Sequence, residues 1–335
     1  MFEEEVLETI KKYNLIQKDD KIVLAVSGGP DSMAMLNGLY KLKEKIHFDI
    51  VVAHINHGLR ENATIDEKYV EEYCQNKNLP FFVLHADIKK EALSEKRGIE
   101  ETGRKIRYTF FNDIMKKTNS NKIALAHNKN DRVETIIMNI LRGTGLNGLK
   151  GIEYKNGMYI RPLLDFDREK IEEYCKQECL NPRHDESNDE NEYTRNKIRN
   201  IAIPYIKKEF NPNIIDTMIR FSNIASEEHD WVEEIVEKEY NKIEILEEKD
   251  KIELDLKKFN EQREVVQKKI LLHAICKIFG SSQNIEKVNI DDLVKMCNKN
   301  IGNKYLTPNK NTKVLIKDKK IIISKLKWIT SIFFI

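Results

Sequence analysis

Residues 21–32 read KIVLAVSGGPDS, an apolar run that ends in Ser27-Gly28-Gly29-Pro30-Asp31-Ser32 and leads into the helical pattern MAMLNGLYKLKEK. The apolar run predicts a buried strand, and the two glycines allow the backbone to approach a ligand closely. The free N–H groups at the start of the following helix can bind an anion. A turn with only a Ser/Asp helix cap is the plainer alternative. The complete hexamer favours a phosphate-binding loop.

Three further apolar runs alternate with helical patterns. They are FDIVVAHIN (48–56), PFFVLHAD (80–87) and NKIALAH (121–127). Apolar strands separated by helices are typical of a parallel sheet covered by helices on both faces. Ligands of such sheets bind beyond the carboxyl ends of the strands. We therefore predict a doubly wound α/β catalytic domain over residues 1–212, with its site just after the strands.

The pattern changes after residue 212. Helical periodicity over residues 213–240, 264–279 and 285–299 predicts a helical substrate-binding domain over residues 213–300. Three short runs, KYLTP (304–308), TKVLIKD (312–318) and KKIIISKLK (319–327), predict strands, which we interpret as a β remnant over residues 301–335.

Composition is that of a soluble globular protein. The 335 residues carry 57 Lys+Arg against 55 Asp+Glu, so a nucleic-acid partner must meet a local basic surface. The five cysteines form no CxxC pair and no signal peptide is recognisable, which favours a reducing cytoplasm with free thiols over a zinc site. No stretch approaches the roughly 20 apolar residues that a membrane span needs. A homodimer is compatible with the sequence.

The hexamer resembles the pyrophosphate-binding loop, SGGxDS, of the PP-loop ATP pyrophosphatase superfamily. Members of that superfamily cleave ATP to AMP and pyrophosphate while they adenylate an oxygen. The chain has no GxxxxGK[ST] pattern, so it is not a P-loop NTPase. GTGLNG at residues 143–148 fits GxGxxG but follows a helical pattern rather than a strand, and we reject a dinucleotide site there.

Further motifs narrow the resemblance. They read HINHGLR (54–60), EETGRKIRY (100–108), DRVET (131–135), RGTGLNGLKG (142–151), RPLL (161–164), DESN (185–188) and YTRNKIR (193–199). In this order they resemble the tRNA(Ile)-lysidine synthetase family, with its HxNHxLR, EExxRxxRY, DxxET, RGxGxxGLxG, RPLL and DxSN…YxRNxIR motifs. The resemblance covers residues 20–210 closely and the helical region more loosely.

The resemblance implies an ATP-dependent ligase that adenylates the wobble cytidine of tRNA(Ile) with a CAU anticodon, after which L-lysine displaces AMP to give lysidine. ATP and Mg²⁺ are the implied cofactors. ATP binding is implied for Ser27, Gly28, Gly29, Pro30, Asp31 and Ser32, with Asp31 also expected to hold Mg²⁺. Catalytic or substrate contacts are implied for Arg107, Asp131, Glu134 and Thr135. Further ATP or tRNA contacts are implied for His54, Asn56, His57, Arg104, His127, Arg142, Arg195, Asn196 and Arg199.

The acidic and basic positions also have plainer interpretations. Asp131, Glu134 and Thr135 share one helix face, where two carboxylates can orient an ammonium group such as that of lysine, or hold a metal. Alternatively, Asp131 caps the helix and Glu134 is solvated. Arg104 and Arg107 lie one turn apart and can contact phosphate or the activated base. Their alternative is a surface helix with ion pairs to nearby glutamates.

Two other groups have similar alternatives. His54 and His57 follow a strand, but no further ligands complete a zinc site, so we expect rings that bond to the backbone and shape the nucleotide pocket. Residues 193–208 hold five basic and no acidic side chains, together with Tyr193 and Tyr205. This segment suits a phosphate backbone and a stacked base, and a solvated helix is the alternative.

The chain departs from the family pattern in two places. Many members read HHxDDQxET where this chain has HNKNDRVET (127–135), so no role is carried over to Asn128, Asn130 or Arg132. The chain ends in WITSIFFI (328–335), where members usually continue into another small domain that helps to grip tRNA. We interpret this ending as a truncation and expect ATP binding to survive while tRNA affinity falls.

Three other functions are weighed against this one. A tRNA thiolase of the same superfamily needs paired or catalytic cysteines near the ATP loop, and Cys74, Cys175 and Cys179 lie outside the strand-end motifs. An amide-forming pyrophosphatase that acts on a small molecule has no use for the basic YTRNKIR segment. A catalytically silent nucleotide or RNA binder would show ATP binding without turnover.

Overall fold

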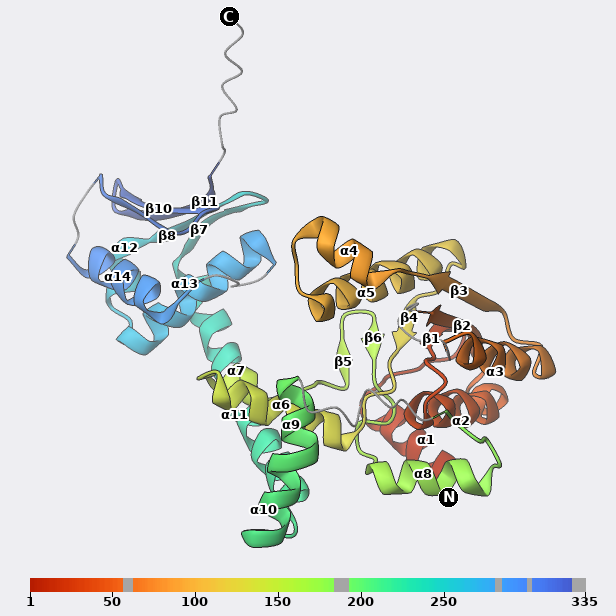
Figure 1. The fold of residues 1–335 in the computed structure, drawn as a ribbon. Coiled ribbons are helices and arrows are strands. Elements are labelled where there is room, and N and C mark those ends of the chain that lie inside the picture. The colour runs from red at the N-terminus through yellow and green to blue at the C-terminus, as the bar shows by residue number, and fades with distance from the viewer. Residues whose placement is uncertain (57–62, 184–192, 281–284, 300–302, 327–335) are drawn as a thin grey trace, which may run out of the picture. The chain divides into compact units, whose positions relative to one another are not determined.

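The computed structural model describes residues 1–56, 63–183, 193–280, 285–299 and 303–326. The chain divides into two compact units, Met1–Ser226 and Glu227–Ile335 (Figure 1). In the described part of the chain, no helix is both long and apolar enough to cross a membrane. His57, the DESN motif and the apolar ending WITSIFFI lie outside the described residues.

The first unit is built on a six-stranded sheet in the order β3-β2-β1-β4-β6-β5. Its strands are β1 (Lys21–Ala25), β2 (Asp49–Asn56), β3 (Phe81–His85), β4 (Lys122–Ala124), β5 (Lys155–Asn156) and β6 (Tyr159–Ile160). All neighbouring strands pair in parallel except β5 and β6. The four predicted strands are confirmed. The β5–β6 hairpin was not predicted, because two-residue strands are too short to show a period.

Helices cover both faces of this sheet, and alternate residues of β1 supply the two cores (Figure 1). Ile22 and Leu24 pack with α1 (Phe2–Lys12), α2 (Pro30–Ile46), α3 (Ala63–Asn76) and α8 (Arg168–Gln177). Val23 packs with Phe111 and Ile114 of α5 (Ile99–Lys117), against which α4 (Ile88–Glu95) lies. Burial of each such side chain stabilises the fold by about 1.5–3 kcal/mol. The doubly wound architecture is therefore confirmed.

The rest of the first unit is helical. It comprises α6 (Lys129–Leu141), α7 (Leu146–Leu149), α9 (Thr194–Lys197), a π-helix (Ile198–Ala202), α10 (Ile203–Glu209) and the first part of α11 (Ile214–Ile243). Val133, Ile198, Ile203 and Ile215 form a small core that holds these helices together. The GTGLNG pattern follows α6 and runs into α7, so the expected helix rather than a strand precedes it.

The second unit combines helices with an antiparallel sheet in the order β7-β8-β11-β10-β9. Its elements are β7 (Glu244–Glu248), β8 (Lys251–Asp255), α12 (Leu256–Asn260), α13 (Glu264–Phe279), α14 (Lys287–Asn298), β9 (Tyr305–Asn309), β10 (Thr312–Lys317) and β11 (Lys320–Lys325). Tyr240 and Phe259 are the largest buried side chains of its core. The predicted helices and late strands are present.

The domain boundaries differ from the predicted ones. The last three strands, expected as a separate remnant, belong to one sheet with β7 and β8, because β11 pairs with β8 through Ile321↔Leu254 and Ile323↔Ile252. β7 and β8 lie in the region expected to be helical, where many charged residues hide the short apolar alternation. The two units divide at Ser226, within α11, rather than at residue 212.

Candidate active site

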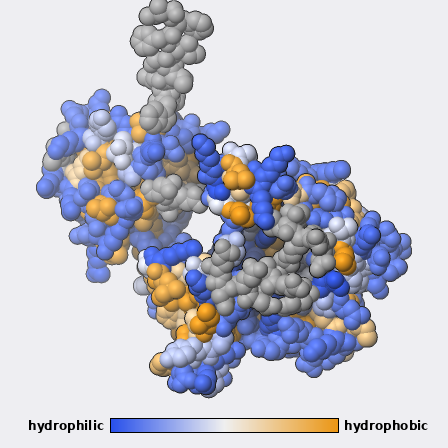
Figure 2. Space-filling view, viewed as in Figure 1, coloured by the Kyte–Doolittle hydropathy of each residue, from blue (hydrophilic) through white to orange (hydrophobic). Residues whose placement is uncertain are grey.

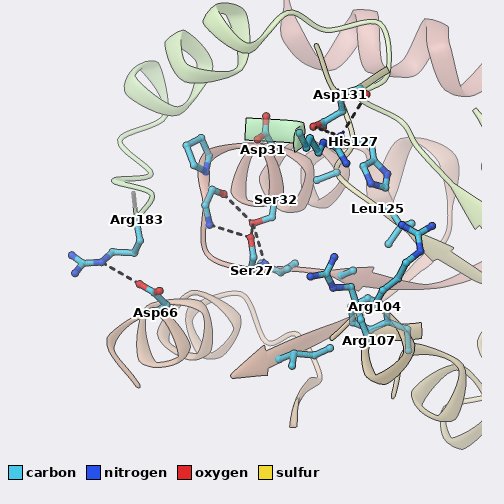
Figure 3. A pocket seen from close by; sticks show the side chains of 18 of the residues that line it. Ser27, Asp31, Ser32, Asp66, Arg104, Arg107, Leu125, His127, Asp131 and Arg183 are labelled. Carbon is cyan, nitrogen blue, oxygen red and sulfur yellow. Dashed lines mark hydrogen bonds and ion pairs between the residues drawn. The ribbon is translucent and has the colours of Figure 1, made fainter. Parts of the chain in front are cut away.

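A pocket of about 510 Å³ lies where β1, β2 and β4 end, which is the predicted edge of the sheet. Among the described residues, six arginines and three aspartates line it: Arg104, Arg107, Arg168, Arg183, Arg195, Arg199, Asp31, Asp66 and Asp131 (Figure 3). The excess of positive charge favours a polyanionic ligand. The volume falls in the range of small-molecule and cofactor sites.

The 27–32 loop forms one wall of this pocket, and Ser32 organises it. The Ser32 hydroxyl accepts hydrogen bonds from the backbone N–H groups of Ser27 (3.2 Å) and Gly28 (3.1 Å) and donates one to the carbonyl of Gly29 (2.9 Å). Gly28 has a backbone φ of +93°, a conformation that residues with a Cβ atom rarely adopt. Among the described residues, no side chain caps α2, which begins at Pro30. The N–H groups of Asp31 and Ser32 in its first turn therefore remain available to an anion.

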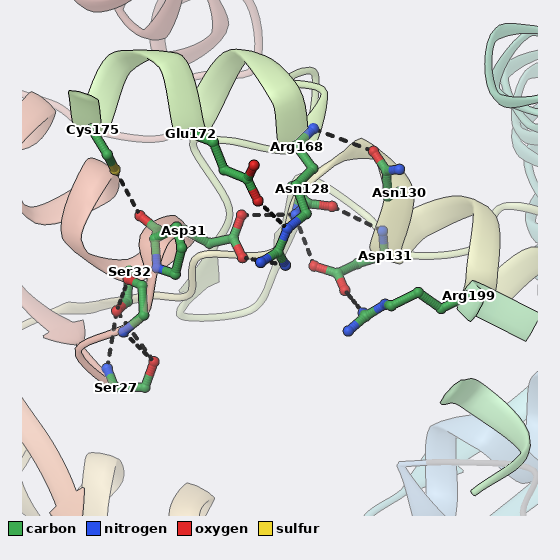
Figure 4. A network of polar contacts seen from close by, with 12 residues as sticks. Ser27, Asp31, Ser32, Asn128, Asn130, Asp131, Arg168, Glu172, Cys175 and Arg199 are labelled. Atoms are coloured by element: carbon green, nitrogen blue, oxygen red, sulfur yellow. Dashed lines mark hydrogen bonds and ion pairs between the residues drawn. The ribbon is translucent and has the colours of Figure 1, made fainter. Parts of the chain in front are cut away.

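Asp31 projects from the first turn of α2 into a polar network (Figure 4). Its Oδ1 accepts a hydrogen bond from Asn128 Nδ2 at 2.8 Å, and its Oδ2 lies 3.5 Å from Arg168 Nη1. Burial raises the pKa of the Asp31 carboxyl, and the negative charge of Asp131 adds to this effect. A bound cation would favour the ionised form. Asn128, a position to which no role was carried over, thus holds Asp31 and caps α6.

Asp131 and Glu134 bind two arginines instead of facing solvent. Glu134 is 1% exposed, and its oxygens accept hydrogen bonds from Arg195 Nε (2.7 Å), Arg199 Nε (2.5 Å) and Arg199 Nη2 (2.9 Å). Asp131 Oδ1 lies 2.9 Å from Arg195 Nη2 and 3.1 Å from Arg199 Nη2. Asp131 lines the pocket, whereas Glu134 lies behind it. The carboxylates therefore hold both guanidinium groups at the pocket wall.

Two histidines near the site are neutral for the same physical reason. Burial lowers the pKa of His127 to about 4, and its Nδ1 accepts a hydrogen bond from Arg161 Nε at 3.3 Å, so the proton lies on Nε2. His54 is buried, and its Nδ1 bonds to the carbonyl of Val26 at 2.9 Å; burial lowers its pKa as well. The expected bond between His54 and the backbone is confirmed, but the ring does not line the pocket.

Arg104 and Arg107 project from α5 into the pocket (Figure 3). Arg104 lies over the Tyr108 ring, 5.0 Å from its centroid, and its Nη2 is 3.4 Å from the Tyr108 hydroxyl. Arg107 is open to the pocket, but the surrounding walls partly desolvate it, which lowers the pKa of its guanidinium. The structure gives Arg107 no carboxylate partner among the described residues, so it is available to an anionic ligand.

Some predicted site residues do not line the pocket. Asn56 donates to Glu67 Oε2 (2.8 Å), Thr135 donates to the carbonyl of Asp131 (2.8 Å), and Arg142 is exposed at the end of α6. Asn196 does line it.

The pocket also contains residues that sequence reasoning did not assign to the site, namely Asp66, Arg168 and Arg183. Arg168 follows the RPLL motif but belongs to none of the motifs that carry the resemblance. Arg183 is a lone basic residue in an acidic stretch of sequence, and nothing in the spacing connects it with the loop.

Aromatic and basic side chains are exposed on the segment 193–210, which contains the pocket residues Arg195 and Arg199. Tyr193, Tyr205 and Phe210 are 45%, 60% and 74% exposed, and Lys197 and Lys208 are exposed as well. Figure 2 shows apolar and hydrophilic residues interspersed over the region of α6, α7 and α10. Exposed rings beside cations are the combination that binds unpaired bases and their phosphates.

Comparison with known proteins extends these observations. Residues 1–206 match the PP-loop domain family. The chain is 41% identical to the tRNA(Ile)-lysidine synthase of Clostridioides difficile over 97% of its own length and 71% of that protein. It is 42% identical to the synthase of Caldanaerobacter subterraneus subsp. tengcongensis and 40% identical to that of Clostridium acetobutylicum. Each of these two matches covers 91% of this chain, and they cover 65% and 66% of the respective relatives.

Among solved structures, the U34-tRNA thiolase NcsA from Methanococcus maripaludis, with its [4Fe-4S] cluster, superposes with a TM-score of 0.54 at 16% identity. The match covers 67% of this chain and 78% of the thiolase chain. At this identity the likeness concerns the fold alone.

Proposed function

Because the chain belongs to the tRNA(Ile)-lysidine synthase family, we propose that it uses ATP to join L-lysine to the wobble cytidine of tRNA(Ile) with a CAU anticodon. The observation that carries the proposal is the 27–32 loop, which opens into an arginine-rich pocket at the carboxyl edge of the sheet. Such a pocket suits a nucleoside triphosphate with a second substrate beside it.

In the first proposed step, the carbonyl oxygen on the cytosine ring attacks the α-phosphorus of ATP. The bond between that phosphorus and the oxygen bridging to the β-phosphorus breaks, and pyrophosphate leaves with the electron pair. The β- and γ-phosphates bind at the 27–32 loop through the N–H groups of Asp31 and Ser32 at the start of α2. Arg107, which has no carboxylate partner among the described residues, stabilises negative charge near the α-phosphate. Positioning and electrostatic stabilisation supply most of the rate enhancement.

Mg²⁺ fits this site as a companion of ATP. It usually binds through one or two carboxylates together with the phosphates of the substrate, and Asp31 is a carboxylate at the start of the helix that follows the loop. The ion would neutralise charge on the phosphates during their displacement. Asn128 orients the Asp31 carboxylate through the 2.8 Å hydrogen bond.

In the second proposed step, the side-chain amine of lysine attacks the ring carbon that carries the adenylated oxygen. The carbon–oxygen bond breaks, AMP leaves, and the attacking nitrogen loses a proton. We assign the orientation of lysine to Asp131, which lines the pocket, and to Glu134 behind it. Since both carboxylates bind Arg195 and Arg199, an ammonium group reaches Glu134 only when one of these arginines moves.

The cysteines give no support to sulfur transfer. Cys74 and Cys175 are buried, and burial raises the pKa of each thiol to about 12, so neither is a thiolate at neutral pH. Cys175 lies near the loop, but its sulfur bonds to the carbonyl of Pro30 at 3.5 Å and does not line the pocket. Within the described parts of the chain, no three metal-ligating side chains of the His, Cys, Asp and Glu types come together.

The proposal is tested by measuring AMP release from ATP with the purified chain and a tRNA(Ile) transcript bearing CAU, with and without L-lysine. We expect AMP release that depends on lysine and retention of labelled lysine on the RNA. The matched control is the same transcript with UAU, which lacks the wobble cytidine and should give neither. ATP binding without turnover on the CAU transcript would contradict the proposal and indicate a silent binder.

A further inference from the structure

Arg183 is fixed beside the phosphate loop although sequence reasoning gave it no role. Its backbone N–H donates to the carbonyl of Gly28 at 3.0 Å, and a Cβ placed on Gly29 would lie 3.8 Å from the Arg183 carbonyl. Its side chain lines the pocket. Because the main chain makes the contact with the loop, a substitution at this position keeps the backbone bond and changes only the guanidinium.

Asp66 of α3 borders the same loop from another direction and pairs with Arg183. A Cβ placed on Gly28 would lie 3.7 Å from both the Cβ and the carbonyl oxygen of Asp66. The Arg183 Nε lies 3.4 Å from Asp66 Oδ1. In Figure 3 this pair lies on one side of the loop, and Arg104 and Arg107 lie on the other. A phosphate group on the loop would thus have arginines on both sides.

Among the described residues, the Arg183–Asp66 pair is the most exposed of the arginine–carboxylate pairs whose two members line the pocket. It has a single contact, and its side chains are 45% and 25% exposed, whereas Arg195 and Arg199 bind a carboxylate that is 1% exposed. Exposed ion pairs contribute little to stability, while a guanidinium binds phosphate through two parallel hydrogen bonds. Neither Nη atom of Arg183 has an acceptor among the described residues.

We propose that Arg183 exchanges Asp66 for the terminal phosphates of ATP and is a binding residue for the pyrophosphate moiety. Asp66 keeps the guanidinium beside the loop until the nucleotide arrives. The inference rests on the proposed role of the pocket as an ATP site. It predicts that Arg183 acts on ligands that contain linked phosphates and not on AMP, whose single phosphate would lie farther from the loop.

Equilibrium binding of ATP, pyrophosphate and AMP to the full chain, without tRNA or lysine, tests the proposal. Arg183→Gln should weaken ATP and pyrophosphate binding about tenfold, equivalent to about 1.4 kcal/mol, and leave AMP binding unchanged. Arg97→Gln is the matched control, since Arg97 is also 45% exposed, pairs through Nε with Glu95 at 3.6 Å and lies outside the pocket. Wild-type ATP affinity in Arg183→Gln, or an equal loss for AMP, would overturn the proposal.

A double-mutant cycle tests the exchange itself. Asp66→Asn removes the competing carboxylate and should raise ATP affinity two- to threefold, with the gain absent in the Arg183→Gln background. An equal gain in both backgrounds would show that Asp66 acts only through its own charge and would refute the exchange. If the chain binds ATP but makes no lysidine, the proposed function fails, yet these binding results still decide the role of Arg183. Failure of the proposed function is therefore distinguishable from failure of the proposed role of Arg183.

Discussion

Replacing Glu134 with glutamine keeps the shape of this buried side chain but removes the charge that holds two arginines. The wild-type oxygens accept three hydrogen bonds from Arg195 and Arg199 at 2.5–2.9 Å. Glutamine offers one acceptor oxygen, and its amide N–H groups would face guanidinium donors. Breaking a buried ion pair costs about 3–5 kcal/mol, but these arginines are 31% and 27% exposed and keep Asp131, so we expect about 2 kcal/mol.

Thermal and urea denaturation measure this loss. For a unit of the size of Met1–Ser226, 2 kcal/mol corresponds to a fall in Tm of about 4–8 °C. Turnover with saturating ATP and lysine should fall as well at a temperature where the variant is fully folded, because Arg195 and Arg199 lose their fixed positions at the pocket wall. The control is Glu209→Gln, which changes an exposed glutamate of α10 and should leave Tm within 1 °C of wild type. An unchanged Tm together with unchanged turnover for Glu134→Gln would refute the positioning role.

Three further substitutions test other parts of the site. Ser32→Ala removes the hydroxyl that organises the loop and should weaken ATP affinity by about tenfold, measured by titration, with a loss of stability of about 1–2 kcal/mol. Asp131→Asn should raise the KM for lysine more than the KM for ATP in steady-state kinetics; equal effects on both would contradict its role. Because the folded pKa of His127 is about 4 and the unfolded value is about 6.5, the unfolded chain binds more protons between these values and stability falls as pH drops through this range. In urea titrations, the free energy of unfolding of the wild type should be lower at pH 4.5 than at pH 7. His127→Gln should reduce this difference by about 1–2 kcal/mol, after allowance for the partial exposure of the ring.

The sequence predicts the parts of this molecule whose signal is local. The phosphate loop and the four main strands lie in contiguous stretches, and the apolar run of each strand needs no partner to be recognised. The hairpin of β5 and β6 has no such signal, because its strands have two residues each. β7 and β8 were not predicted because they contain many charged residues and few apolar ones. Their sheet also depends on pairing between β8 and β11, which lies far along the chain and leaves no local signal.

In the candidate site, too, residues with a local sequence signal were predicted and residues without one were not. Asp31, Arg107 and Asp131 were predicted because they stand in motifs, and the fold brings all three to one pocket. The pair of Arg183 and Asp66 exists only because a distant segment returns to the loop, which no spacing in the sequence reveals. Sequence reasoning also treated Glu134 as a ligand-facing group, whereas its burial beneath two arginines becomes visible only in three dimensions.

We propose that this pocket attaches lysine to a cytidine in RNA. Mass spectrometry of nucleosides tests this, using the CAU transcript after incubation with the purified chain, ATP, Mg²⁺ and isotope-labelled L-lysine. We expect one cytidine per tRNA to gain the mass of one labelled lysine less one water, and no such nucleoside with Asp31→Asn or in the absence of ATP. An unmodified transcript after ATP has been shown to bind, or a sulfur-containing nucleoside, would contradict it.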